Sequence, residues 1–187
     1  MKKLKFYIVN NDYVKYLQKS ELDKRGFTRV PNNDYEKNSR KPKFFCGVVL
    51  SVDGKDYYVP VSSYKTQKPD NFLIYSDNGE ATSSLRFNYM FPIPKESVVV
   101  RNIPNERNEA YKRLLLQELE YCVNNQSVIH KLAERTYNRV LLGKDLGLVA
   151  NACDFKFLEE MCVEYCRKNN LKIPQSLARQ PLPPPQK

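Results

Sequence analysis

The sequence holds a single histidine, His130, among its 187 residues. A mechanism that needs two imidazoles, one as general base and one as general acid, is therefore excluded. Long apolar runs are also lacking: no segment reaches the roughly 20 apolar residues that a membrane helix needs. The apolar stretch near the N-terminus is too short for a signal-peptide core. We therefore expect a cytoplasmic protein with no membrane partner.

Groups of residues that hold metal ions are missing as well. The five cysteines form no C-x-x-C pair, and Cys162 and Cys166, one helical turn apart, are accompanied by neither a second pair nor a second histidine. Such cysteines are typical of reduced thiols in a cytosol. No D-x-D or H-x-x-E motif occurs, and the closely spaced carboxylates lie in predicted loops or turns: Asp34 and Glu36, Asp53 and Asp56, Asp77 and Glu80. We expect no zinc site, no metal-dependent nuclease centre and no cofactor.

Positive charge is what the sequence has in excess. The formal net charge is +10, and residues 1–75 hold 15 Lys and Arg against 8 Asp and Glu. A basic region of this density favours a polyanionic partner, most simply RNA or DNA, because phosphate contacts dominate such affinities. The alternative, that the charge only keeps the surface soluble, stays open at this point.

The hydrophobic pattern predicts an α+β fold with strands first and helices last. Six strands are expected over residues 4–9, 44–52, 56–61, 71–75, 85–93 and 96–103, and helices over 10–22, 105–124, 127–142 and 154–168. Asp53-Gly54 predicts a hairpin turn between the second and third strands. We expect a mostly antiparallel sheet packed with C-terminal helices in one domain over residues 1–170, with a long basic loop at 23–43. The proline-rich residues 171–187 are expected to form an extended, mobile tail.

The segment YYVPVSSYKTQKP, residues 57–69, ends a predicted strand with hydroxyl groups beside a lysine. Serine commonly caps nearby backbone groups where a strand stops. Hydroxyls beside an ammonium group also suit the binding of an anion. Ser62 and Lys65 match the S-x-x-K of penicillin-binding enzymes, but that serine opens a buried helix whereas Ser62 ends a strand, and no K-T-G follows.

Lysine and hydroxyl groups have a specific use in phosphoryl transfer. They stabilise the extra negative charge on a five-coordinate phosphorus. RNA carries its own nucleophile, the 2′-hydroxyl, so positioning and charge stabilisation suffice for cleavage. DNA lacks that hydroxyl, and this chemistry therefore points to RNA.

Five segments spread over roughly residues 4–168 resemble the ToxN/AbiQ family: FYIVNNDYVKYL, KPKFFCGVVL, YYVPVSSYK, RFNYMFPIP and YKRLLLQELEYC. These proteins are endoribonuclease toxins of type III toxin–antitoxin and phage abortive-infection systems, and the sequence is similar to their CptN-like branch in particular. The resemblance implies a strongly twisted antiparallel sheet related to the Kid/MazF toxins. It also implies metal-independent RNA cleavage that leaves 2′,3′-cyclic phosphate and 5′-hydroxyl ends.

The resemblance also implies site residues. The family's Thr/Ser-Ser-Pro-Lys segment falls on Ser62, Ser63, Tyr64 and Lys65, with Tyr64 in place of proline. Catalytic roles are thus expected for Lys65, Ser63 and Ser62. The general base stays open between Lys65, a tyrosine, water and none. RNA contacts are expected from a further set: Tyr13, Tyr35, Lys41, Lys43, Tyr64, Thr66, Lys68 and Asn88.

The partners implied by the resemblance are RNAs. Substrates are cellular or phage RNAs, and the inhibitor is an antitoxin RNA of pseudoknot repeats that the toxin itself trims. We expect each antitoxin RNA to bridge two proteins, so that a closed ring forms with equal numbers of protein and RNA chains. Two alternatives remain, a non-catalytic RNA-binding module and a structural subunit of a ribonucleoprotein.

Overall fold

The structure, a computed structural model, describes residues 3–32 and 43–174. Its sheet has the strand order β4-β5-β3-β2-β1-β7, with β6 paired to β3, and every pair is antiparallel. The strands are β1 (Lys5–Val9), β2 (Phe45–Val52), β3 (Lys55–Ser62), β4 (Asn71–Tyr75), β5 (Ala81–Arg86), β6 (Phe91–Pro92) and β7 (Val98–Val100). The helices are α1 (Asn11–Arg25), α2 (Glu109–Asn124), α3 (Gln126–Leu142), α4 (Leu146–Asn151) and α5 (Phe155–Lys168). The predicted α+β class, with an antiparallel sheet and C-terminal helices, is confirmed.

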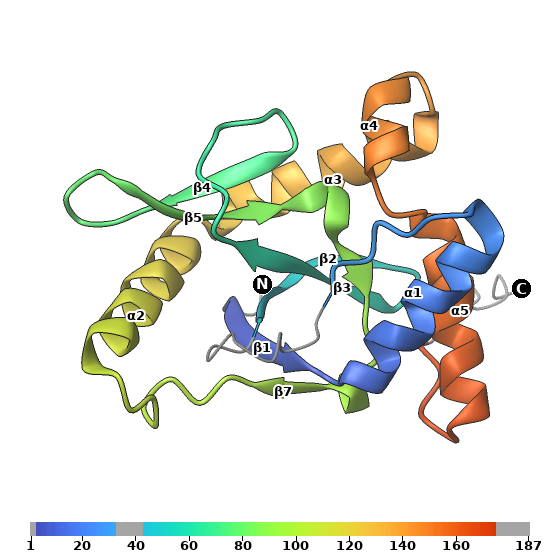
Figure 1. Cartoon of the computed structure of the whole chain (residues 1–187), viewed down its shortest axis with the longest axis horizontal. Helices are drawn as coiled ribbons and strands as arrows, with labels where there is room; N and C mark the ends of the chain where they lie inside the picture. Colours follow the sequence, from blue (N-terminus) through green and yellow to red (C-terminus); the bar gives the residue numbers. More distant parts are fainter. Residues whose placement is uncertain (1–2, 33–42, 175–187) are drawn as a thin grey trace, which may run out of the picture.

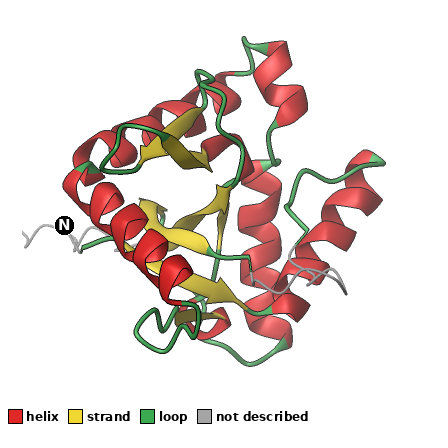
Figure 2. Cartoon of the chain, turned by 60° about the vertical axis from the view of Figure 1, so that its left-hand side comes forward, coloured by secondary structure: helices red, strands yellow, loops and turns green. Residues whose placement is uncertain are grey.

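Helices cover the sheet on both sides (Figure 2). Helix α1 follows β1 and lies beside α5, although the two are far apart in sequence (Figure 1). Helix α3 packs against β2, and α2 packs against β4. The core between these layers is rich in aromatic side chains, and Tyr13, Tyr57 and Phe155 are fully or almost fully buried in it. The sheet and helices therefore share one hydrophobic core.

The turns at the start of the sheet follow the sequence closely. The side chain of Asn10 accepts hydrogen bonds from the backbone N–H groups of Asp12 and Tyr13 and so caps α1. Asp53 and Gly54 join β2 to β3 with positive φ angles of 48° and 76°, as a tight two-residue hairpin requires. The predicted hairpin and the predicted start of the first helix near residue 10 are confirmed.

The predicted strand over residues 85–93 is wrong. Strand β5 already begins at Ala81, since a tight turn that ends at Gly79, with φ of 78°, closes the β4–β5 hairpin early. After Arg86 the chain makes a 3₁₀ turn, Phe87–Tyr89, which buries Phe87 in the core. The separate two-residue strand β6 then pairs with β3. The sequence did not indicate this break, because aromatic residues run through the segment and favour a strand throughout.

Other boundaries also differ from the prediction. Helix α1 continues to Arg25 and ends at Gly26, whose φ of 75° is the left-handed conformation common after a helix. The last strand is only Val98–Val100, and the helix α4 was not predicted. Helix α2 starts at Glu109 rather than residue 105, because Asn108 caps its first turn.

All five cysteines are buried free thiols, as the sequence indicated. Burial raises the pKa of Cys162 to about 12 and that of Cys153 well above its usual value. In the described part of the chain, no three His, Cys, Asp or Glu side chains gather in an arrangement that could hold a metal ion. Within these same residues, no helix has the length and apolar character that crossing a bilayer demands.

Candidate functional site

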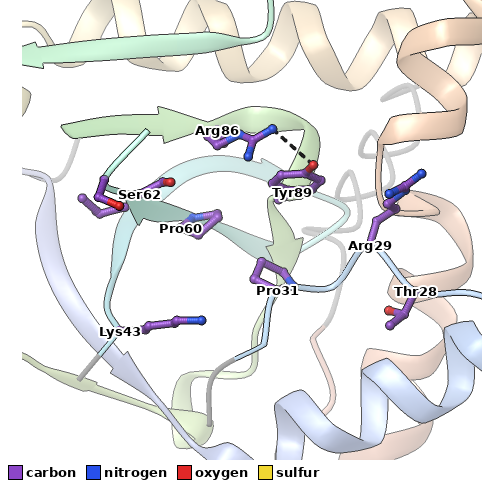
Figure 3. A pocket seen from close by; sticks show the side chains of 10 residues that line it. Thr28, Arg29, Pro31, Lys43, Pro60, Ser62, Arg86 and Tyr89 are labelled. Atoms are coloured by element: carbon purple, nitrogen blue, oxygen red, sulfur yellow. Dashed lines mark hydrogen bonds between the residues drawn. The ribbon is translucent and has the colours of Figure 1, made fainter. Parts of the chain in front are cut away.

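An open cleft of about 480 Å³ lies where β3 ends. One wall is the segment after α1, Thr28–Pro31, and the opposite wall is the end of β3 with the adjoining turn after β5 (Figure 3). The lining residues are Thr28, Arg29, Pro31, Lys43, Pro60, Val61, Ser62, Ser63, Arg86 and Tyr89. Both predicted catalytic serines therefore line one concave surface.

The charge in this cleft is positive. Arg29, Lys43 and Arg86 line it, and none of the described lining residues is acidic. Lys43 and Arg86 lie on opposite sides of Pro60 (Figure 3). The Lys43 ammonium donates a hydrogen bond of 2.7 Å to the Asn32 carbonyl, which holds it at the cleft edge. The arrangement suits an anion placed between the two sides.

Arg86 is held by two aromatic rings. Its guanidinium lies 4.3 Å from the ring centre of Tyr89 and 5.0 Å from that of Tyr64. It also donates a hydrogen bond of 3.2 Å to the Tyr89 hydroxyl, drawn in Figure 3. Cation–π contacts of this kind stabilise by about 0.5–1 kcal/mol at exposed sites. They fix the direction of the guanidinium.

The serine wall is braced by neutral hydrogen bonds. Ser62 pairs with Ser84 of β5, and its hydroxyl accepts a bond of 3.2 Å from the backbone N–H of Tyr64. The Ser84 hydroxyl donates a bond of 2.5 Å to the Tyr64 carbonyl. The capping role expected of a serine at a strand end is thus present. Because the Ser62 hydroxyl is the acceptor in its bond with the Tyr64 N–H, its own proton remains available for donation to a ligand.

The loop that follows is organised by Asn71, which is 4% exposed. Its amide oxygen accepts bonds from the Lys68 backbone N–H at 2.9 Å and the Gln67 side chain at 3.0 Å. Its amide nitrogen donates to the Thr66 carbonyl at 2.9 Å. Lys65, Thr66 and Lys68 are exposed on this loop, outside the residues that line the cleft.

The opposite wall is held by one buried carboxylate, Glu21 of α1, which is 0% exposed. It accepts bonds from the Thr28 hydroxyl at 2.8 Å and the Arg29 backbone N–H at 2.6 Å. It also accepts from the Asp154 backbone N–H at 2.7 Å and pairs with Arg25 at 2.9 Å. This single group joins α1, α5 and the cleft wall.

Several predicted RNA contacts do not lie in the cleft. Tyr13 is fully buried, donates its hydroxyl to the Pro92 carbonyl at 2.6 Å and packs edge-on against Tyr165. Burial also raises its pKa well above the usual value. This core position corrects the expectation that Tyr13 touches RNA.

The other predicted RNA contacts differ in their positions. Asn88 is buried, with 2% of its surface exposed, whereas Lys43 lines the cleft and the Tyr64 ring lies against Arg86. Tyr35 and Lys41 lie outside the described residues.

The sequence analysis missed four of the lining residues that have polar side chains: Thr28, Arg29, Arg86 and Tyr89. Arg86 and Tyr89 fall in a segment predicted as one strand, so the turn that brings both to the cleft was not foreseen. For Arg29 the sequence did offer a signal that it contributes to a site. It is a basic residue three positions after Gly26, the glycine at which the helix ends. Thr28 gave none.

Comparisons with known proteins agree with one another. The family model described as "Toxin ToxN, type III toxin-antitoxin system" matches residues 5–163. The endoribonuclease ToxN of Pectobacterium atrosepticum is 30% identical over 166 residues, which cover 84% of this chain and 91% of that protein.

Two solved structures are also similar. One comes from work on selective toxin inhibition by a non-coding RNA pseudoknot; it has a TM-score of 0.77 and 24% identity, covering 88% of this chain and 98% of its own. The other comes from work on a processed non-coding RNA that regulates a bacterial antiviral system; it has a TM-score of 0.71 and 27% identity, covering 83% of this chain and 95% of its own. The fold is therefore shared across both comparisons.

Proposed function

The chain belongs to the ToxN toxin family of type III toxin–antitoxin systems, and on this premise we propose that it is an endoribonuclease toxin that an antitoxin RNA inhibits. The observation that carries the proposal is the cleft at the end of β3. There the two serines of the family's motif share one concave surface with three cationic side chains, Arg29, Lys43 and Arg86. Such a surface suits a phosphodiester in an RNA strand.

The proposed reaction is attack by the 2′-hydroxyl of RNA on the adjacent phosphorus. The P–O5′ bond breaks as the O2′–P bond forms, and the products are a 2′,3′-cyclic phosphate and a 5′-hydroxyl. The proton of the 2′-hydroxyl leaves to a base, and the departing O5′ takes up a proton. The general base stays open between Lys65, a tyrosine, water and none.

The proposed roles follow from position. The Ser62 and Ser63 hydroxyls donate hydrogen bonds to the non-bridging phosphate oxygens, where negative charge grows in the transition state. Lys65 supplies an ammonium from the exposed loop two residues beyond Ser63. Arg86 is the cation that lines the cleft beside the serines and is a second source of positive charge at the phosphorus. Lys43, Tyr64, Thr66 and Lys68 are proposed to contact neighbouring nucleotides.

The proposed control is by RNA. A positively charged cleft exposed to solvent binds any RNA through its phosphates, so a folded antitoxin RNA is its natural occupant. We expect each pseudoknot repeat to bridge two proteins in a closed ring, because linked binding events raise the effective concentration. Once released from the antitoxin RNA, the toxin would cleave cellular and phage RNA. A Kid/MazF-like core, cytoplasmic location and an inert proline-rich tail also remain predictions.

The first experiment incubates the purified protein with a long RNA in EDTA. Discrete fragments with 2′,3′-cyclic phosphate ends are expected, and replacing the ribose 5′ to the cut by 2′-deoxyribose should abolish cutting there. Continued cutting of the deoxy substrate would mean that the attacking group comes from protein or water. Binding without any cutting would favour the alternative, a non-catalytic RNA-binding module.

The second experiment compares Lys65→Ala with Arg86→Ala. Loss of a transition-state charge partner costs about 10²–10³ in rate, so the variant with the larger loss identifies the principal cation. Lys131→Ala, which changes an exposed lysine of α3 away from the cleft, is the matched control. Near wild-type cutting by Lys65→Ala would remove that residue from the catalytic set.

A further inference from the structure

The departing O5′ of the proposed cleavage needs a proton. The side chains that supply a proton in catalysis are histidine, the carboxylic acids, lysine, tyrosine and cysteine. Arginine does not, because its guanidinium keeps its charge in proteins. Among the described residues that line the cleft, two are of a suitable kind, Lys43 and Tyr89. The cleft thus offers one ammonium and one phenol as proton donors.

Lys43 is bound to the edge of the cleft. Its ammonium donates a hydrogen bond of 2.7 Å to the carbonyl of Asn32, the residue that follows the wall Thr28–Pro31. In Figure 3 it lies on the other side of Pro60 from Arg86. A cation in this position suits a contact with a phosphate.

Tyr89 presents its hydroxyl in a different way. The hydroxyl oxygen accepts a hydrogen bond of 3.2 Å from the Arg86 guanidinium, drawn in Figure 3. Within residues 3–32 and 43–174, the hydroxyl donates its own proton to no other group. The side chain is partly buried and lines the cleft. Tyr89 therefore offers an uncommitted proton beside a positive charge.

The contact with Arg86 favours loss of that proton. Phenols are protonated at neutral pH. A phenol that gives up its proton becomes a phenolate, and the guanidinium then donates to an opposite charge. Such a hydrogen bond is stronger than one to a neutral hydroxyl. Because the bond strengthens as the proton leaves, it lowers the barrier rather than only binding the substrate.

We propose that Tyr89 is the general acid of the reaction and protonates the departing O5′. The inference rests on the proposed ribonuclease function, since it assigns one proton of that reaction. As the 2′-oxygen bonds to phosphorus, the electron pair of the P–O5′ bond moves to O5′, which takes the Tyr89 proton and becomes the 5′-hydroxyl. Arg86 stabilises the phenolate, and solvent water returns a proton to it before the next turnover.

Carboxyl groups are a rival source of the proton only outside the described lining of the cleft. Asp70 and Asp145 line an adjoining cavity of about 320 Å³, which shares Arg86 and Tyr89 with the cleft. Asp145 is paired with Arg139 at 2.6 Å. Asp70 is therefore the carboxyl group to test.

The test replaces the leaving oxygen by sulfur. A short RNA with one cut site is prepared either with O5′ or with a bridging 5′-sulfur, which leaves as a thiolate and needs no proton because thiols are more acidic than alcohols. Tyr89→Phe should lower the single-turnover rate on the oxygen substrate about 10²–10⁴-fold, the usual contribution of a general acid. On the sulfur substrate this variant should react at the wild-type rate.

The two substrates separate proton transfer from positioning. Tyr89→Phe also removes the oxygen to which Arg86 donates, and a displaced guanidinium would slow both substrates alike. Equal losses on the two substrates, or no loss on either, would overturn the assignment. The variant keeps the ring that Arg86 contacts at 4.3 Å, so the fold should tolerate the change.

A second variant decides the question if near-UV circular dichroism shows that Tyr89→Phe does not fold. Tyr89→3-fluorotyrosine keeps the hydroxyl but makes it a stronger acid. The fall of the rate at alkaline pH should therefore move to lower pH on the oxygen substrate alone. An unchanged pH profile, or the same move on both substrates, would overturn the assignment.

Rival donors are tested with the same pair of substrates. Lys43→Ala and Lys65→Ala should slow both substrates alike, since neither residue is proposed to protonate O5′. Asp70→Asn should show no difference between the substrates. If sulfur restores the rate of one of these variants and not that of Tyr89→Phe, the proton comes from that other residue and the proposal is overturned.

The matched control is Tyr75→Phe, which removes a hydroxyl from a partly buried tyrosine of β4 outside the cleft. It should cut both substrates at the wild-type rate, and a loss confined to the oxygen substrate would overturn the assignment. The failure of the two proposals is distinguishable. Absence of cutting of any RNA by the wild-type protein would reject the ribonuclease itself, whereas cutting that Tyr89→Phe does not slow rejects only the general acid.

Discussion

One wall of the cleft, Thr28–Pro31, depends on a buried carboxylate, whereas the opposite wall, Ser62–Tyr64, is held by neutral hydrogen bonds. The first wall depends on a single side chain, Glu21, which also accepts hydrogen bonds from Arg25 and from the backbone at the start of α5. The serine wall spreads its support over Ser84, Asn71 and strand pairing. A single substitution should therefore damage the first wall far more than the second.

The difference also bears on function. The carboxylate wall carries Thr28 and Arg29, and the serine wall carries the proposed catalytic hydroxyls. The proposed chemistry thus lies on the wall whose support is redundant. The wall that depends on one charge carries residues that we propose bind the RNA.

The largest effect is expected for Glu21→Ala. Removing one partner of a buried, hydrogen-bonded ion pair costs about 3–5 kcal/mol, because the remaining donors are left without an acceptor. Urea unfolding should show this loss of unfolding free energy. RNA cleavage under folding conditions should fall about 10²-fold, since a displacement of about 1 Å at a positioning group has this cost.

Glu159→Ala is the control for that prediction. Glu159 is also buried, and it accepts bonds from the hydroxyls of Tyr57 at 2.8 Å and Tyr137 at 2.5 Å, away from the cleft. The Glu159→Ala variant should lose a similar free energy of unfolding, but the folded variant should cleave RNA at the wild-type rate. Equal loss of cleavage in both variants would show that stability alone, and not the wall, sets activity.

An intermediate effect is expected for Asn71→Ala. The change leaves the Lys68 N–H and the Thr66 carbonyl without their partner, at a cost of about 1–3 kcal/mol. Cleavage should fall less than in Glu21→Ala, because Ser84 and strand pairing still hold Ser62 and Tyr64. Urea unfolding and cleavage rates measured together test the ranking, and a loss of activity as large as that of Glu21→Ala would reverse the comparison.

The smallest effect at neutral pH concerns Cys162, a buried core residue of α5. Burial raises the pKa of Cys162 to about 12 from 9.0. The unfolded thiol loses its proton above about pH 9 while the folded one keeps it, so unfolding free energy should be unaffected below pH 9 and fall as pH rises from 9 to 12. The slope is about 1.4 kcal/mol per pH unit for this group. Urea midpoints at pH 7, 8, 9 and 10 measure it, with Cys162→Ala expected to be flatter above pH 9.

The elements with strong local signals could be predicted from the sequence. Asp53-Gly54 indicated the hairpin turn, and Asn10 indicated the start of the first helix. The apolar residues spaced from Tyr111 to Cys122 indicated the helix that the structure shows as α2. The strand ending at Ser62 was also found, and with it the serines of the cleft. These features depend on residues close together in the sequence.

The cleft itself could not be predicted in full. Its far wall is Thr28–Pro31, where Thr28 and Arg29 donate hydrogen bonds to the buried Glu21, which also accepts from the start of α5. Arg86 and Tyr89 meet there because a 3₁₀ turn interrupts what the pattern predicted as one strand. Tyr13 seemed available near a helix start, yet its hydroxyl is used by the Pro92 carbonyl 79 positions away. Such tertiary contacts leave no trace in local periodicity.

Arg86 shows how the folded protein has prepared its cleft. A free arginine samples many rotamers, and ordering a long charged side chain on binding costs about 0.5–1.5 kcal/mol. The rings of Tyr64 and Tyr89 and the bond to the Tyr89 hydroxyl have already removed that freedom before any ligand arrives. An incoming phosphate therefore meets a guanidinium whose conformational entropy was lost during folding, and its affinity is higher by that amount.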